Sequence, residues 1–185
     1  MRAAGYVLVG GRSRRMGSDK ALLSWGAGTL LQHVAAEVGA AAGSVTLVGD
    51  PGKYSYFGFP VIGDRTPGNG PLGGVVAALH ACPEDWALIV ACDMPNINTA
   101  FLTGLIEAAA GLTQFDCVAP ETESGPEPLC ALYHRRALPP LDSLLERKAL
   151  KMQDAVRHLR TRFLPVIGSA WFRNLNTPED LKPHV

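Results

Sequence analysis

The strongest constraint on the fold is the alternation of short apolar runs with segments whose apolar residues recur every three to four positions. Such runs are typical of strands buried on both faces, and the longer period is typical of amphipathic helices. Strands are expected at residues 4–9, 45–48, 60–62, 86–91, near 117, at 129–133 and at 163–166. Helices are expected from Thr29 to Gly43, from Pro71, from Thr99, over 141–146 and 151–159, and after Thr177. This order predicts an α/β fold with three layers, in which helices cover both faces of a mostly parallel central sheet.

The size and composition favour one compact domain over residues 1–185. The chain has 185 residues, of which 47% are hydrophobic, and no internal repeat or linker divides it. Its 17 basic side chains balance 17 acidic ones, so the overall charge gives no reason to expect binding to nucleic acid or to an anionic membrane. The four cysteines are widely spaced and are expected to be buried free thiols.

The chain also lacks the patterns of a secretory signal and of a membrane helix. The first apolar run precedes a cluster of arginines, which is the opposite of the order in a secretory signal. The uncharged stretch at 66–83 is rich in glycine and proline, which excludes it as a membrane helix. A cytoplasmic location is therefore expected.

The loop after the first strand has the composition of a polyphosphate site. Gly10 and Gly11 allow the backbone to approach a ligand closely, and Arg12, Arg14, Arg15 and Lys20 add four positive charges. Backbone donors and cations together are what a triphosphate requires. The loop is not a P-loop, because Gly17 is followed by Ser-Asp, and it lacks the spacing of the dinucleotide fingerprint. An extended run at 21–23 is expected to fix the backbone after Lys20.

Two acidic residues follow the ends of other expected strands, and a group of glycines begins an expected helix. Asp93 follows a fully apolar strand, where a carboxylate can hold Mg²⁺ or cap a helix. Asp64 also follows a strand, and it can contact a nucleotide or form a loop turn. The glycines at 70–74 are costly in a helix, so we expect a flat base to pack against that turn.

The loop after the first strand resembles the signature of the nucleotidyltransferase superfamily, and most closely that of its molybdenum cofactor guanylyltransferase (MobA-type) branch. Residues 8–20 read L-V-G-G-R-S-R-R-M-G-S-D-K. The resemblance continues in family order through Asp64, 70–74, 92–95 and 174–181. Each block alone is weak evidence for the family, but the ordered set is strong evidence and covers nearly the whole chain. Two positions differ from the family pattern: Val9 replaces the usual Ala, and Glu127 precedes Pro128 where many relatives have His.

The resemblance implies a Rossmann-like nucleotidyltransferase fold and an enzyme that transfers GMP from Mg-GTP to the terminal phosphate of molybdopterin. Pyrophosphate would leave, and the guanine dinucleotide cofactor would pass to partner proteins. It implies catalytic roles for Lys20, Arg15 and Asp93, of which Asp93 would hold Mg²⁺. The implied nucleotide contacts are Leu8, Val9, Gly10, Gly11, Arg12, Lys20, Asp64, Gly70, Gly74 and Asp93. Asn174 and Asn176 would contact the acceptor, although ordering the last turn is an alternative role for them.

Three other functions fit parts of the same pattern. A cytidylyltransferase acting on the same pterin differs only in the base that it selects. A sugar-phosphate nucleotidyltransferase is disfavoured because such chains are usually longer. An inactive nucleotide-sensing adaptor is disfavoured because both Lys20 and Asp93 are present.

Overall fold

The computed structural model describes residues 1–10, 19–64, 68–173 and 175. Its central sheet has the strand order β10-β7-β9-β6-β1-β4-β5, and β8 pairs with β7. The strands of this sheet are β1 (Ala3–Leu8), β4 (Val45–Val48), β5 (Val61–Ile62), β6 (Trp86–Ala91), β7 (Cys117–Thr122), β8 (Gly125–Pro126), β9 (Cys130–His134) and β10 (Thr161–Pro165). A small hairpin joins β2 (Ser24–Trp25) to β3 (Gly28–Thr29). The predicted strands are confirmed.

The sheet is mostly parallel, as the sequence predicts. The four strands β6, β1, β4 and β5 run in the same direction, and β10 is parallel to β7. The exceptions are β9, which is antiparallel to both of its neighbours, β6 and β7, and the short strand β8, which is antiparallel to β7.

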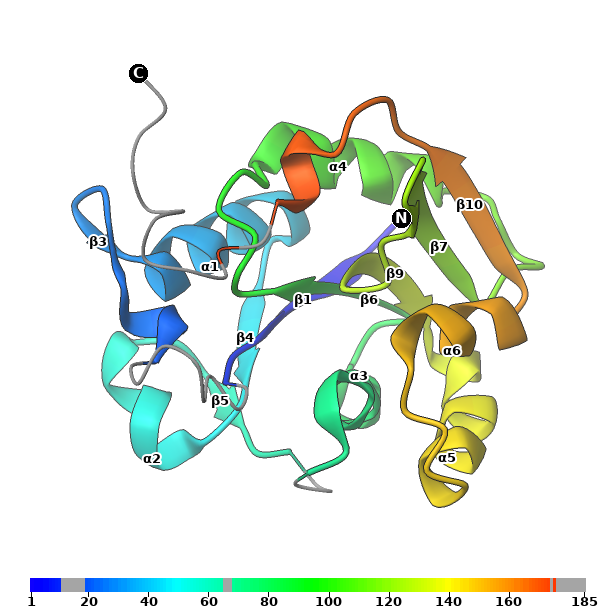
Figure 1. Ribbon diagram of the computed structural model, residues 1–185, viewed down its shortest axis with the longest axis horizontal. Coiled ribbons are helices and arrows are strands. Elements are labelled where there is room, and N and C mark those ends of the chain that lie inside the picture. Colours follow the sequence, from blue (N-terminus) through cyan, green and yellow to red (C-terminus); the bar gives the residue numbers. More distant parts are fainter. Residues whose placement is uncertain (11–18, 65–67, 174, 176–185) are drawn as a thin grey trace.

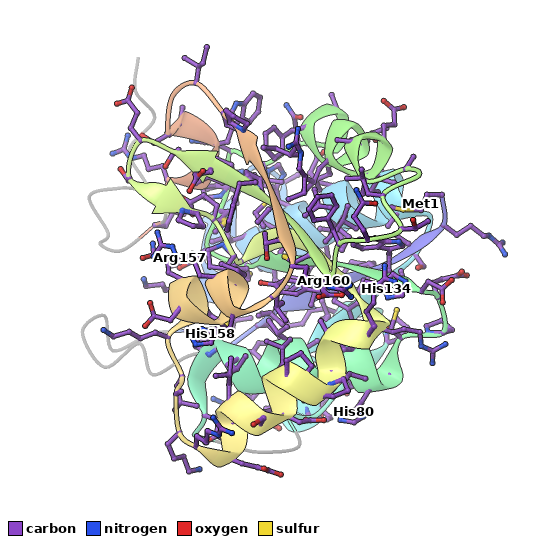
Figure 2. All side chains as sticks on the ribbon, turned by 90° about the vertical axis from the view of Figure 1, so that its right-hand side faces the viewer. Met1, His80, His134, Arg157, His158 and Arg160 are labelled. Carbon is purple, nitrogen blue, oxygen red and sulfur yellow. The ribbon has the colours of Figure 1, made fainter. Side chains whose placement is uncertain are left out.

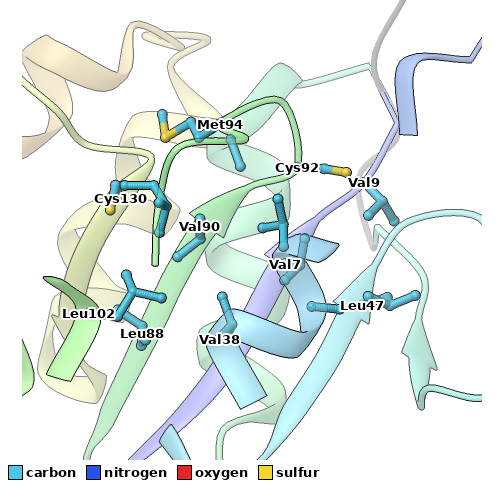
Figure 3. Packing of buried hydrophobic residues seen from close by; sticks show 14 of the residues in the cluster. Val7, Val9, Val38, Leu47, Leu88, Val90, Cys92, Met94, Leu102 and Cys130 are labelled. Carbon is cyan, nitrogen blue, oxygen red and sulfur yellow. The ribbon is translucent and has the colours of Figure 1, made fainter. Parts of the chain in front are cut away.

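Helices cover both faces of the sheet, which confirms the three-layer α/β fold (Figure 1). The helices are α1 (Leu30–Ala42), α2 (Pro51–Tyr54), α3 (Gly70–Ala81), α4 (Thr99–Ala108), α5 (Leu138–Glu146) and α6 (Met152–His158). One layer contains α1 and α4, and the other contains α3, α5 and α6. Figure 3 shows the first interface, where Val38 of α1 and Leu102 of α4 pack on Val7 and Val90 of the sheet.

Local sequence signals explain several element boundaries. Thr29 accepts a hydrogen bond from the Gln32 backbone and the Gln32 side chain bonds back, a capping box that begins α1. Gly43 ends the helix in the left-handed conformation, with φ 76°. The prediction of an extended run at 21–23 is wrong, because Asp19 caps a short 3-10 helix at Lys20–Leu22. The helix predicted after Thr177 lies outside the described residues.

At the amino end of β7, a buried carboxylate holds the edge of the sheet together. Asp116 accepts hydrogen bonds from the Arg160 side chain at 2.9 and 2.7 Å, and the Arg136 Nε atom lies 3.1 Å away. Hydrogen bonding to Arg160 lowers the pKa of Asp116. Figure 2 places Arg160 beside His134, the last residue of β9. This network therefore joins β7, β9 and β10 at the end of the sheet where β6 and β1 begin.

Two further expectations concern the cysteines and the membrane. Cys82, Cys92, Cys117 and Cys130 are buried free thiols, as predicted. Among the helices formed by the described residues, none is long and apolar enough to cross a membrane.

The packing of β1 against α1 and β4 predicts a different result for two glycine substitutions. A Cβ atom at Gly5 would lie 2.4 Å from the Ser44 oxygen and 2.6 Å from Val38 Cγ1. We expect Gly5→Ala to lower the free energy of unfolding by about 1–3 kcal/mol, because the close-packed core must shift. Gly104 in α4 has open space around it, so Gly104→Ala should raise stability by about 0.5–1 kcal/mol. Urea denaturation of both variants checks this, and equal stabilities would contradict it.

Candidate active site

The carboxyl ends of the parallel strands bring the predicted site residues to one edge of the sheet. Leu8, the last residue of β1, is in register with Val48 and with Ala91. Beyond the strands, the Val9 amide donates to the Val48 oxygen at 2.9 Å, and the Cys92 amide donates to the Leu8 oxygen at 3.1 Å. The loops that carry Gly10, Asp64 and Asp93 therefore leave the sheet at the same edge, where ligands bind in folds of this kind.

The turn after β1 depends on a glycine. Gly10 is exposed and has φ 93°, a conformation that an L side chain rarely adopts. A Cβ atom there would lie 3.5 Å from the Tyr54 hydroxyl. The predicted site residues Gly11, Arg12 and Arg15, like Asn174 and Asn176, lie outside the described residues.

Val9 contributes to the core through its side chain, which explains how the chain accommodates a residue larger than Ala. It is buried in the cluster that contains Tyr54 and Leu47 (Figure 3 labels Val9 and Leu47). A Cβ atom at Gly49 would lie 2.6 Å from Val9 Cγ2, so the glycine after β4 leaves the space that Val9 fills. The Val9 side chain therefore packs in the core, and only its backbone is available to the site.

A buried tyrosine fixes the position of the helix that carries Lys20. The Tyr54 hydroxyl donates to Asp19 Oδ2 at 2.6 Å, and the Ala21 amide donates to Asp19 Oδ1 at 3.1 Å. Burial and the bond to Asp19 raise the pKa of Tyr54 above its usual range, so the phenol keeps its proton. No sequence motif marks Tyr54 as part of the site. The only local signal was Asp50-Pro51, which caps and begins α2, the helix that ends at Tyr54.

Lys20 and Asp93 lie close enough to interact electrostatically. Asp93 is half-buried, and its burial raises the pKa of the carboxyl, an effect that the positive charge of Lys20 opposes. The Asp93 backbone oxygen also accepts a hydrogen bond at 3.0 Å from Leu175 near the end of the chain. A half-buried carboxylate beside an ammonium group can bind a cation when an anionic ligand supplies further oxygens.

The glycine-rich start of α3 packs against β1. Gly70 begins the helix with φ 61°, and a Cβ atom at Gly74 would lie 3.1 Å from Leu8 Cδ2. The close approach of Leu8 therefore gives Gly74 a packing role between helix and sheet. The preceding Asn69 is buried and accepts a hydrogen bond from Lys148 Nζ at 2.9 Å.

Comparison with known proteins gives a consistent result. The family model described as "MobA-like NTP transferase domain" matches residues 5–162. A Deinococcus radiodurans protein named "Probable molybdenum cofactor guanylyltransferase" is 37% identical over 177 residues, which cover 95% of this chain and 90% of that protein. A Bacillus cereus (strain G9842) protein of the same name is 31% identical over 189 residues, covering 97% and 94%.

A solved structure agrees with these relatives. The molybdopterin-guanine dinucleotide biosynthesis protein A from Archaeoglobus fulgidus superimposes with a TM-score of 0.77 at 25% identity. The alignment covers 96% of this chain and 94% of that one.

The contact between Tyr54 and Asp19 predicts a local effect on the Lys20 helix. Tyr54→Phe removes the hydroxyl donor and leaves a half-buried carboxylate with one partner fewer. We expect the free energy of unfolding to fall by about 2 kcal/mol, the scale of a hydrogen bond to a charged group. The Ala21 amide should also exchange faster with solvent. Tyr56→Phe, at a residue that is 89% exposed, is the control and should change neither quantity. Unchanged exchange at Ala21 in the Tyr54 variant would argue against this positioning role.

Proposed function

Because the chain belongs to the family of MobA-like NTP transferase domains, we propose that it transfers GMP from Mg-GTP to the terminal phosphate of molybdopterin. It is a nucleotidyltransferase, and its relatives are named for guanylyl transfer in molybdenum cofactor synthesis. The products would be pyrophosphate and the guanine dinucleotide cofactor. The observation that carries the proposal is the juxtaposition of Lys20 and Asp93 beside the left-handed turn at Gly10.

The proposed reaction is an in-line displacement at the α-phosphorus of GTP. An oxygen of the acceptor phosphate attacks the phosphorus, and the bond to the leaving pyrophosphate breaks. Because the attacking oxygen is already anionic, no strong general base is required. The protein must therefore supply orientation and neutralise negative charge. We assign the backbone amides of Gly10 and Gly11, with Arg12, Arg15 and Lys20, to the triphosphate.

Lys20 is the residue best suited to the leaving group. Its backbone is fixed by the 3-10 helix that Asp19 caps, and Asp19 is held by Tyr54. A positioned ammonium group can stabilise charge as it develops on pyrophosphate, because it needs no reorganisation during the reaction.

The residues present fit a magnesium ion that arrives with the nucleotide. Within the ranges that the structure describes, no three His, Cys, Asp or Glu side chains gather into a metal cluster. Asp93 would therefore be the main protein ligand, a half-buried hard oxygen next to the proposed triphosphate position. Mg²⁺ commonly binds nucleotides in this way, because it keeps several waters and bridges phosphate oxygens. The bound ion would neutralise phosphate charge during transfer.

The base and ribose would be bound on the other side of Gly10. We propose that guanine lies along the Leu8 and Val9 backbone and the first turn of α3 at Gly70 and Gly74. Asp64 would contact the ribose or the metal. The Leu8 side chain packs on Gly74, so it would set the depth of the base site. The proposal also includes a cytoplasmic location and partner proteins that receive the finished cofactor, with no role for nucleic acid.

Base selectivity tests the proposal against the cytidylyltransferase alternative. In a thermal-shift assay with Mg²⁺, GTP should raise Tm more than CTP, UTP or ATP. Ligand at 100 times its Kd should stabilise the protein by about 2.7 kcal/mol. The same assay mixture with molybdopterin should release pyrophosphate only when GTP is present. Equal shifts with GTP and CTP, or release with CTP, would contradict guanine selectivity.

Asp93→Asn tests the metal assignment. The substitution preserves the shape of the side chain but removes the charge, so we expect kcat/KM for pyrophosphate release to fall at least about a hundredfold, or about 2.7 kcal/mol of transition-state stabilisation. The fold should survive, because burial disfavours the ionised carboxylate that the variant removes. Activity should be measured across a Mg²⁺ titration, with Tm as the control. Near-native turnover at ordinary Mg²⁺ would overturn the role of Asp93.

A further inference from the structure

A cavity of about 280 Å³ opens between the loop after β6 and the connection from β8 to β9. Its wall includes Met94, which follows Asp93, and Pro71, which follows Gly70 in α3. The opposite wall comes from the connection between β8 and β9 and from α6. Glu127, Leu129, Met152 and Gln153 are the lining residues that matter below.

The walls of this cavity suit a flat aromatic ring. Met94 and Met152 are 2% and 8% exposed, and thioether sulfurs make favourable contacts with aromatic rings. Leu129 and the prolines around the cavity add apolar surface. The volume is just below the range for small-molecule pockets, roughly 300–1,000 Å³, so it matches a bicyclic heterocycle better than a whole nucleotide.

Glu127 is the one carboxylate in this wall, and its backbone is rigidly held. It lies between Pro126 and Pro128, its amide donates to the Pro120 oxygen at 2.9 Å, and its own carbonyl accepts from the Cys130 amide at 3.2 Å. Among the residues that the structure describes, none donates a hydrogen bond to the carboxylate or forms an ion pair with it. The side chain is half-buried, and this burial raises its pKa. Because no group of the described residues occupies its oxygens, the carboxylate can accept hydrogen bonds from a ligand that supplies two N–H groups.

We infer that this cavity binds the pterin ring of the acceptor and that Glu127 determines its specificity. The carboxylate accepts two hydrogen bonds from the adjacent N–H and NH₂ groups of the 2-amino-4-oxopyrimidine edge. The inference rests on the proposed function, since it assumes that the acceptor is a pterin.

Guanine presents the same hydrogen-bonding edge as pterin. The position of the cavity distinguishes which of the two rings it binds. The sheet order is β9-β6-β1-β4-β5, and the Gly10 turn and Asp64 follow β1 and β5. The cavity lies on the opposite side of Asp93, towards β9. A pterin there would direct its phosphate towards Asp93 and Lys20, where transfer is proposed.

The test compares Glu127→Gln with Glu123→Gln. Glu123 is an exposed carboxylate in the turn between β7 and β8, just before the segment that carries Glu127, and it does not line the cavity, so it is the matched control. In Glu127→Gln one acceptor oxygen becomes an NH₂ group that faces an N–H donor. We expect the acceptor KM to rise at least about tenfold, which corresponds to about 1.4 kcal/mol, while the KM for GTP stays within about twofold. Glu123→Gln should leave both constants unchanged.

Equilibrium binding without nucleotide separates recognition from turnover. Pterin and lumazine, which has an oxygen in place of the 2-amino group, are titrated against each protein and followed by ligand fluorescence. The wild-type protein should prefer pterin at least about tenfold, and Glu127→Gln should lose most of that preference. A purely structural role for Glu127 would not change this ratio.

Each contrary result has a defined meaning. A higher KM for GTP with an unchanged acceptor KM would overturn the inference, because Glu127 would then read guanine. Unchanged constants and an unchanged pterin-to-lumazine ratio would also overturn it. If the wild-type protein binds pterin selectively but transfers no GMP to molybdopterin, the proposed function fails while the binding site stands.

Discussion

The parallel register of β1 between β4 and β6 is the constraint on which the site depends. Leu8 is opposite both Val48 and Ala91, so three strands end at one level and their loops diverge from one edge. Side chains alternate along a strand, so a slip of one residue would turn Leu8 away from Gly74 and Val9 away from Gly49. The buried strands and the helices on both faces hold this register. The position of Lys20 relative to Asp93 follows from it.

Three glycines maintain that register by allowing close approach. Gly5 lies against the end of α1, Gly49 against Val9, and Gly74 against Leu8. Their role in each case is to leave space for a neighbouring part of the chain. Gly10 is different, because it is exposed and adopts a left-handed conformation at the edge where the ligand is proposed to bind. Glycines near a site therefore divide into those that shape the scaffold and those that let the backbone approach a ligand.

The carboxylates divide in a similar way. Asp116 is satisfied by two arginines, and this pairing lowers its pKa, as expected for a group that stabilises the fold. Because the folded-state pKa is depressed, this contribution is lost as the pH falls through the acidic range. Asp93 and Glu127 are half-buried, and burial raises the pKa of each. Both lie at the other end of the sheet, beside the proposed substrates. Carboxylates with raised pKa values therefore lie where the ligands are proposed to bind.

The sequence by itself determined the fold class, because the periods of apolar residues depend on local geometry: it predicted the strands, the capping box at Thr29 and the end of α1 at Gly43. It also singled out Lys20 and Asp93 as candidate site residues, because the motifs that contain them are contiguous. Only the tertiary structure decided which residues support them. The contact from Tyr54 to Asp19 spans 35 positions, and the cavity at Glu127 joins α3, the loop after β6, the connection from β8 to β9, and α6. Neither is encoded in a local pattern, because each exists only after distant segments pack together.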